Sequence, residues 1–148
     1  GRNKTEVLEA KAPKVSSKGR LPIVDDGNFF RKHVEFMLTK MGWEVETANN
    51  GDLAMKVLAG SSSSSFTAIV SDLEMPTMDG FTFAQNVRKA KGWSSIPMLA
   101  MTSSYSDPVV ARALESGFDQ LLPKDQLDSI ETLINNVIRM RKETAHAA

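Results

Sequence analysis

The sequence contains no cysteine and only two histidines, His33 and His146. The absence of cysteine excludes thiol catalysis, disulfides, iron–sulfur clusters and cysteine-ligated zinc, and two histidines so far apart do not form a histidine-based metal site. No apolar run approaches the roughly 18 residues that cross a bilayer, and residues 1–20 lack the apolar core of a signal peptide. These absences predict a soluble cytoplasmic protein that does not contact a membrane.

Length and charge predict one domain preceded by a tail. A chain of 148 residues buries about two thirds of its unfolded surface and folds without disulfides or metals. The net charge is zero, but residues 1–20 hold six of the 18 basic and two of the 18 acidic residues. That stretch is poor in large apolar residues, which predicts a linker or disordered tail. No aromatic residue lies among its charges, so we expect no nucleic-acid binding.

From Leu21 onward, short β-like runs alternate with segments of helical periodicity. The runs that predict strands are LPIVDD, WEVETA, TAIVSD, IPMLAMTS and FDQLLPK, and a helical segment follows each of them. Repeated strand–helix units with right-handed crossovers predict an α/β fold, a doubly wound five-stranded parallel sheet with helices on both faces. We place this domain at residues 21–141 and expect residues 142–148 to fray.

The helical segments predict which side chains are buried. The first helix is expected to start at an N-cap, Asn28, and its predicted apolar stripe is Phe29, Val34, Met37, Leu38 and Met41. The second helix is expected to bury Leu53, Val57 and Leu58, and the fifth to bury Leu127, Ile130, Ile134 and Val137. Ser61–Ser65 is expected to be a flexible loop, and Pro22 is unusual in a central strand except at its start or at a bulge.

Polar residues stand at the predicted carboxyl ends of four strands. They are Asp25 and Asp26, then Asp72, then Thr102, then Lys124. The carboxyl ends of parallel strands meet at one edge of the sheet, where ligands bind in such folds. Carboxylates gathered there repel one another unless a cation joins them, and all-oxygen ligands favour Mg²⁺ before Ca²⁺ or Mn²⁺.

A hydroxyl and an ammonium group at the same edge suit the oxygens of a phosphoryl group. A carboxylate beside Mg²⁺ can itself be the nucleophile and give an acyl phosphate. Each residue alone is also compatible with a structural role, since acids cap turns and a single lysine is usually solvated. Their coincidence at four strand ends favours the functional interpretation.

Four segments carry a resemblance to a known family. They are IVDD (23–26), SDLEMPTMDG (71–80), AMTS (100–103) and LLPK (121–124). With these segments, the chain resembles a response-regulator receiver domain, the phosphoryl-accepting module of two-component signalling. The resemblance implies the strand order 2-1-3-4-5 of flavodoxin-like sheets. It also implies that Asp72 accepts a phosphoryl group from a phosphohistidine of a histidine kinase, while Thr102 and Lys124 bind phosphoryl oxygens.

The resemblance implies the metal site as well. Asp26 and Asp72 would bind Mg²⁺ together with the backbone carbonyl of Glu74, and Asp25 would act through a metal-bound water. Phosphorylation would pull Thr102 inward and shift the surface formed by the fourth helix, fifth strand and fifth helix. The segments DDGNFFRKHVEFML and GFDQLLPKDQLDSI look most like receivers fused to CheA-type chemosensory kinases, which predicts regulation of an attached kinase; homodimerisation stays open.

Several positions depart from the family pattern. Leu121 stands where the family often has an aromatic switch residue, and Tyr105 is a candidate substitute. Pro123 precedes Lys124, whereas the family usually has a proline after the lysine. Glu74 adds a fourth carboxyl group that could tune the metal or the hydrolytic water, although it could also be a solvent-facing loop residue.

Two other functions fit parts of the pattern. A Mg²⁺-dependent phosphatase working through an aspartyl phosphate commonly has a second Asp where Glu74 stands, but no cap insertion is visible. A pseudo-receiver would share the fold and act only as a binding surface. A flavin-binding protein of this architecture is disfavoured because no phosphate-cradling loop follows the first strand.

Overall fold

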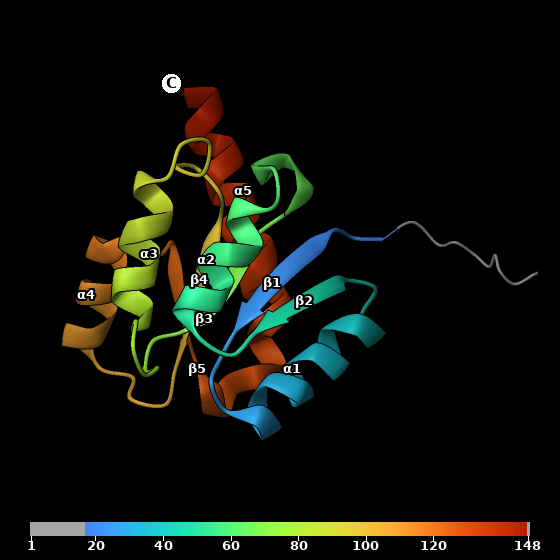
Figure 1. The fold of residues 1–148 in the computed structure, drawn as a ribbon, viewed down its shortest axis with the longest axis vertical. Helices are drawn as coiled ribbons and strands as arrows, with labels where there is room; N and C mark the ends of the chain where they lie inside the picture. The colour runs from blue at the N-terminus through green and yellow to red at the C-terminus, as the bar shows by residue number, and fades with distance from the viewer. Residues whose placement is uncertain (1–16, 148) are drawn as a thin grey trace, which may run out of the picture.

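The computed structural model describes residues 17–147, so most of the predicted tail at 1–20 lies outside the described residues. Five parallel strands form one sheet in the order β2-β1-β3-β4-β5, which confirms the predicted fold (Figure 1). The strands are β1 Arg20–Val24, β2 Glu44–Ala48, β3 Ile69–Asp72, β4 Met98–Thr102 and β5 Gln120–Pro123.

Helices cover both faces of the sheet (Figure 1). They are α1 Asn28–Lys40, α2 Gly51–Ala59, α3 Gly80–Lys89, α4 Asp107–Ser116 and α5 Ile130–Ala147, with short 3₁₀ turns η1 Ser63–Ser65 and η2 Lys124–Ser129. One buried cluster joins α1 and α5 to the sheet, and a second joins α2, α3 and α4 to its other face. Within residues 17–147, no helix is both long and apolar enough to cross a membrane.

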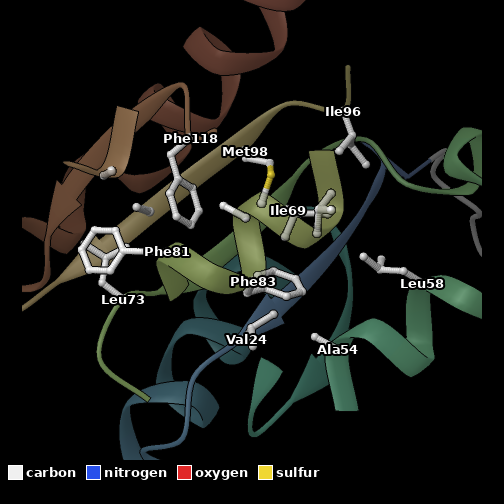
Figure 2. Close-up of a cluster of buried hydrophobic side chains, with 14 of the residues drawn as sticks. Val24, Ala54, Leu58, Ile69, Leu73, Phe81, Phe83, Ile96, Met98 and Phe118 are labelled. Atoms are coloured by element: carbon white, nitrogen blue, oxygen red, sulfur yellow. The ribbon is translucent and has the colours of Figure 1, made fainter. Parts of the chain in front are cut away.

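Alternation along the strands creates the two clusters. Ile69 and Met98 point toward α2 and α3, whereas their neighbours Val70 and Leu99 point toward α1 and α5, because successive side chains of a strand face opposite ways. Figure 2 shows the first cluster, in which Phe83 of α3 lies against β-strand side chains. All five side chains are 0 % exposed. A sheet buried on both faces therefore fixes the positions of its strand ends.

Two expectations about helix faces and one about a helix N-cap were wrong. Phe29 is 86 % exposed and Leu53 is 41 % exposed, because the apolar stripes of α1 and α2 begin one residue later, at Phe30 and Ala54. The N-cap of α1 is Gly27, which makes no side-chain capping bond. Asn28 instead accepts a hydrogen bond from the Arg31 guanidinium at 2.6 Å.

The structure also defines the segment before α5, the end of α5 and the serine loop. Leu127 belongs to η2, because Gln126 has non-helical dihedrals (φ −118°, ψ 40°) and α5 starts at Ile130. The last helix then continues to Ala147, so the described part of segment 142–148 is helical and the predicted boundary at 141 stays a prediction. The Ser61–Ser65 loop contains the single turn η1.

Pro22 lies at the third residue of β1, paired with Glu46 of β2. Its position is tolerated because the pairing of β1 with β3 begins one residue later, at Ile23. Arg20 turns its backbone toward the β3 side, where its carbonyl accepts a hydrogen bond from Thr67. Because backbone groups two residues apart in a strand point the same way, the nitrogen of Pro22 also faces β3. It lies before the first β1–β3 pair, so the N–H that proline lacks removes no hydrogen bond from that ladder.

Thr77, in the loop between β3 and α3, has a φ of +70°. This left-handed conformation is unfavourable for a β-branched residue and more favourable for Asn. We predict that Thr77→Asn raises the free energy of unfolding by about 0.5–1 kcal/mol, measured by urea denaturation. Thr132→Asn on the exposed surface of α5 is the control, since Thr and Asn have similar helix propensities. Equal effects of the two substitutions would contradict strain at Thr77.

Candidate functional site

The sheet brings the predicted site residues to one edge. Asp25 directly follows β1, Asp72 and Thr102 are the last residues of β3 and β4, and Lys124 directly follows β5. Gly80 allows α3 to start against this edge, because a Cβ atom there would overlap the carbonyl oxygen of Asp72. Four separate strand ends therefore contribute side chains to one site, as the sequence predicts.

Three carboxylates form the centre of the site. Asp25, Asp26 and Asp72 each offer an oxygen, and these oxygens lie within 4.8 Å of one another. Asp25 is 1 % exposed and Asp72 is 2 % exposed, whereas Asp26 is open to solvent. The Gly27 amide donates to Asp25 Oδ1 at 2.8 Å, and the Arg31 guanidinium donates to the Asp25 carbonyl at 2.9 Å. These bonds fix the acidic turn after β1.

Lys124 supplies the positive charge. Its Nζ lies 2.9 Å from Asp25 Oδ2 and 3.3 Å from Asp72 Oδ1. The first contact lacks hydrogen-bond geometry, so Asp25 Oδ2 is a buried oxygen without a hydrogen-bond partner among the described residues. One ammonium group therefore contacts two of the three carboxylates and leaves one oxygen without a hydrogen bond from the described residues.

This imbalance shifts the acid–base behaviour of the site. Burial, followed by repulsion from Asp25, raises the pKa of Asp72 to about 7, although Lys124 opposes the shift. Burial alone would lower the pKa of Lys124, but its contacts with Asp25 and Asp72 outweigh burial and raise it. The lysine therefore stays charged, and the Asp72 carboxylate is the group that lacks compensation.

The donor set fits a hard divalent cation. Three carboxylates, one of them carrying the unsatisfied Oδ2 of Asp25, match the oxygen ligands that Mg²⁺ prefers. Glu74 is not among the three. Its carboxylate points to Thr102 instead, so its part in metal binding, expected through the backbone carbonyl, stays a prediction.

Thr102 makes contacts that the sequence did not predict. Its hydroxyl donates to Glu74 Oε2 at 2.8 Å and accepts from the Ser104 amide at 2.9 Å. The side chain is 0 % exposed, while Glu74 lies on the surface. In this state the Thr102 hydroxyl proton is committed to Glu74, so binding a phosphoryl oxygen requires that bond to break.

The lysine loop and α1 complete the site. Lys124 is the first residue of η2, and all peptide bonds among the described residues are trans. The Phe30 ring of α1 lies 4.4 Å from Lys124 Nζ. Sequence reasoning missed Phe30. A signal was present, because Phe30 lies four and eight residues before Val34 and Leu38, the two buried residues of α1. This helical spacing places the Phe30 ring on the inner face of α1.

Comparison with known proteins identifies the family. The sequence model of the family described as response regulator receiver domain matches residues 21–137 of this chain. The chain belongs to the response-regulator receiver family. It is thus a receiver domain of two-component signalling, and its acidic edge corresponds to the acidic pocket in which receiver domains bind Mg²⁺.

Relatives of this receiver include parts of sensor kinases. It is 33 % identical over 125 residues to the sensor histidine kinase RcsC of Salmonella typhi, covering 83 % of this chain and 13 % of RcsC. It is 33 % identical over 101 residues to the sensor histidine kinase CheAY of Helicobacter pylori, covering 68 % of this chain and 12 % of CheAY. The chain therefore spans a small part of these kinases.

A solved structure supports the fold. The chemotaxis protein CheY4 of Vibrio cholerae superimposes with a TM-score of 0.74 at 28 % identity, covering 80 % of this chain and 98 % of CheY4.

The raised pKa of Asp72 makes stability depend on pH. Its folded pKa of about 7 lies above the ordinary aspartate pKa of 3.8, so the native receiver binds more protons than the unfolded chain between these pH values. Stability from this group is present at low pH and is lost as the pH rises through about 7. We predict that Asp72→Asn, which mimics the neutral form, raises the free energy of unfolding at pH 8 by on the order of 2 kcal/mol in chelator-containing buffer and much less at pH 4.

Urea unfolding of both proteins across this range measures the difference. Asp128→Asn removes an exposed carboxylate of η2 and is the matched control. A stability difference between wild type and Asp72→Asn that does not grow from pH 4 to pH 8 would contradict a buried, repelled carboxylate.

Proposed function

We propose that Asp72 accepts a phosphoryl group from a phosphohistidine of a histidine kinase in a Mg²⁺-dependent reaction. The observation that carries this proposal is the juxtaposition of a 2 % exposed Asp72 carboxylate with Asp25, Asp26 and Lys124 at one sheet edge. A carboxylate held between other anions and a single ammonium group is suited to in-line attack once a cation offsets the repulsion.

The proposed reaction transfers a phosphoryl group from an imidazole nitrogen to a carboxylate oxygen. An Asp72 carboxylate oxygen forms a bond to phosphorus while the phosphorus–nitrogen bond of the donor breaks. The imidazole nitrogen leaves with the electron pair and takes up a proton, and the product on Asp72 is an acyl phosphate. Lys124 lies 3.3 Å from the Asp72 oxygen, where its charge would stabilise the equatorial phosphoryl oxygens.

The three carboxylates Asp25, Asp26 and Asp72 would hold Mg²⁺, with the Glu74 carbonyl as a further ligand. When bound, the cation would neutralise charge on the phosphoryl oxygens and on the acids themselves. Asp25 Oδ2, which has no hydrogen-bond partner within residues 17–147, would be oriented by this charge directly or through a water. Lys124 would then be free to turn from Asp25 toward the phosphoryl group.

The switch would pass through Thr102. Binding a phosphoryl oxygen would draw its hydroxyl from Glu74 and move β4 relative to α4. The surface of α4, β5 and α5, on which Leu114 is 48 % exposed and which Tyr105 of the β4–α4 loop borders, would then change its affinity for partner proteins or for a second copy. In this proposal the domain has two conformations, and the phosphoryl group on Asp72 would favour one of them.

We infer further that the domain regulates a chemosensory kinase of the CheA type, in which it would be one segment of a longer chain. The 33 % identity to part of CheAY supports this context, and the similarity to CheY4 is compatible with it. The donor phosphohistidine would then lie in the same polypeptide or in its partner kinase.

Intact-protein mass spectrometry after incubation with phosphoramidate tests the chemistry. Because Asp72 is the acceptor and a cation offsets its neighbours, we predict a phosphoryl adduct that requires Mg²⁺ and is absent from Asp72→Asn. Asp128→Asn, an exposed residue of η2, is the matched control and should give the adduct. An adduct in Asp72→Asn would contradict the assignment of the acceptor, and no adduct in the wild type would favour a pseudo-receiver.

Glu74 should control the lifetime of the phosphoryl group. Its carboxylate accepts a hydrogen bond from the Thr102 hydroxyl, and near the acyl phosphate it would act as a base for the hydrolytic water. We predict that Glu74→Asn lengthens the lifetime of the adduct at least about twofold and changes the free energy of unfolding by less than about 0.5 kcal/mol.

The decay of the adduct after donor removal, followed by mass spectrometry, measures this lifetime. Glu115→Asn makes the same change on the exposed surface of α4 and should leave the lifetime unaltered. An unchanged lifetime in Glu74→Asn would show that the carboxylate faces solvent without a role.

A further inference from the structure

Three groups from three segments enclose the ammonium group of Lys124. Its Nζ lies 2.9 Å from Asp25 Oδ2 and 3.3 Å from Asp72 Oδ1, and 4.4 Å from the centre of the Phe30 ring. The lysine side chain is 18 % exposed, so little of this charge is screened by water. An aromatic face at this distance attracts a cation through its quadrupole, more strongly where both groups are partly desolvated.

The position of the Phe30 ring is fixed by the core. Phe30 packs against the buried cluster beneath α1 and α5, and only part of the side chain reaches solvent. Its neighbour Phe29 is 86 % exposed and stacks on His33 with ring centres 6.4 Å apart. Of two consecutive aromatic residues, only one faces the lysine.

The backbone around Lys124 has irregular geometry. Lys124 starts the 3₁₀ segment η2, and Gln126 interrupts its helical geometry. Asp125, directly after the lysine, is exposed. The contacts of the ammonium group with Asp25, Asp72 and Phe30 therefore help to fix its position at the edge of the sheet.

We propose that Phe30 is a positioning residue for phosphoryl transfer, whose ring holds the Lys124 ammonium group over Asp72 by a cation–π interaction. The same ring borders a cavity of about 510 Å³ that Thr102 and Lys124 also line. This inference rests on the proposed function, because its consequence is the rate of acyl phosphate formation.

Kinetics with phosphoramidate and Mg²⁺ test the role of Phe30. In this reaction the phosphorus–nitrogen bond breaks and a phosphorus–oxygen bond to Asp72 forms. The nitrogen leaves with the electron pair of the broken bond and, once protonated, is released as ammonia. We expect Phe30→Leu, which keeps apolar volume, to lower the maximal rate constant about fivefold without changing the half-saturating donor concentration. Phe29→Leu is the matched control and should leave both values unaltered.

A graded series separates the cation–π interaction from packing. Phenylalanines with one, two or three ring fluorines, placed at position 30, differ little in size while the attraction for a cation weakens stepwise. The maximal rate should fall with each fluorine. A flat series, or an effect of Phe30→Leu on the half-saturating concentration alone, would overturn the proposal.

A double-mutant test removes the cation itself. In a Lys124→Gln background, Phe30→Leu should have no further effect on the maximal rate. An equal fivefold loss there would show that Phe30 has a purely structural role.

The geometry can be tested without phosphorylation. In NMR spectra, the ring current of Phe30 should shift the Cε protons of Lys124 upfield, and Phe30→Leu but not Phe29→Leu should abolish the shift. Absence of this shift in the wild type would overturn the contact itself. If the shift is present but the wild type gains no phosphoryl group, the proposed function fails and the catalytic consequence assigned to Phe30 fails with it, while the contact stands.

Discussion

Repulsion among Asp25, Asp26 and Asp72 is the constraint on which the rest of the site depends. A parallel sheet collects the carboxyl ends of its strands at one edge, and here it brings oxygens of three carboxylates within 4.8 Å of one another. Lys124 offsets part of this charge, yet the pKa of Asp72 still rises to about 7. The folded chain thus keeps an acidic cluster whose charge is only partly compensated, and the proposed cation binding and phosphoryl acceptance would both depend on that excess of negative charge.

The double-sided core is what holds these charges together. The central strands β1, β3 and β4 are buried on both faces, so the loops after them cannot move apart to relieve the repulsion. Gly80 lets α3 begin directly over the Asp72 carbonyl, and α1 brings Phe30 to the lysine. Packing free energy from the two clusters therefore offsets the electrostatic cost at the edge.

The five βα units and the location of the site were accessible from the sequence, because short β-like runs and helical patterns define the units and each unit places its last strand residue at the same edge. The strand order came from the resemblance to the receiver family and not from the pattern itself. Helix faces were less accessible: Phe29 and Phe30 are adjacent and equally apolar, and only the register set by Val34 and Leu38 tells which ring is buried. The Thr102–Glu74 hydrogen bond was out of reach, since it depends on how a surface loop returns across the sheet edge. Likewise, the local sequence PKD (123–125) does not indicate that α1 lies beside Lys124.

Magnesium titration followed by NMR tests the central claim most directly. The account predicts one saturable site whose occupation perturbs the backbone amides after β1 and β3, near Asp25 and Asp72, and which is strongly weakened by Asp26→Asn, a substitution of the exposed member of the cluster. Binding that does not saturate, or that is indifferent to Asp26→Asn, would contradict the claim that the three carboxylates form a cation site.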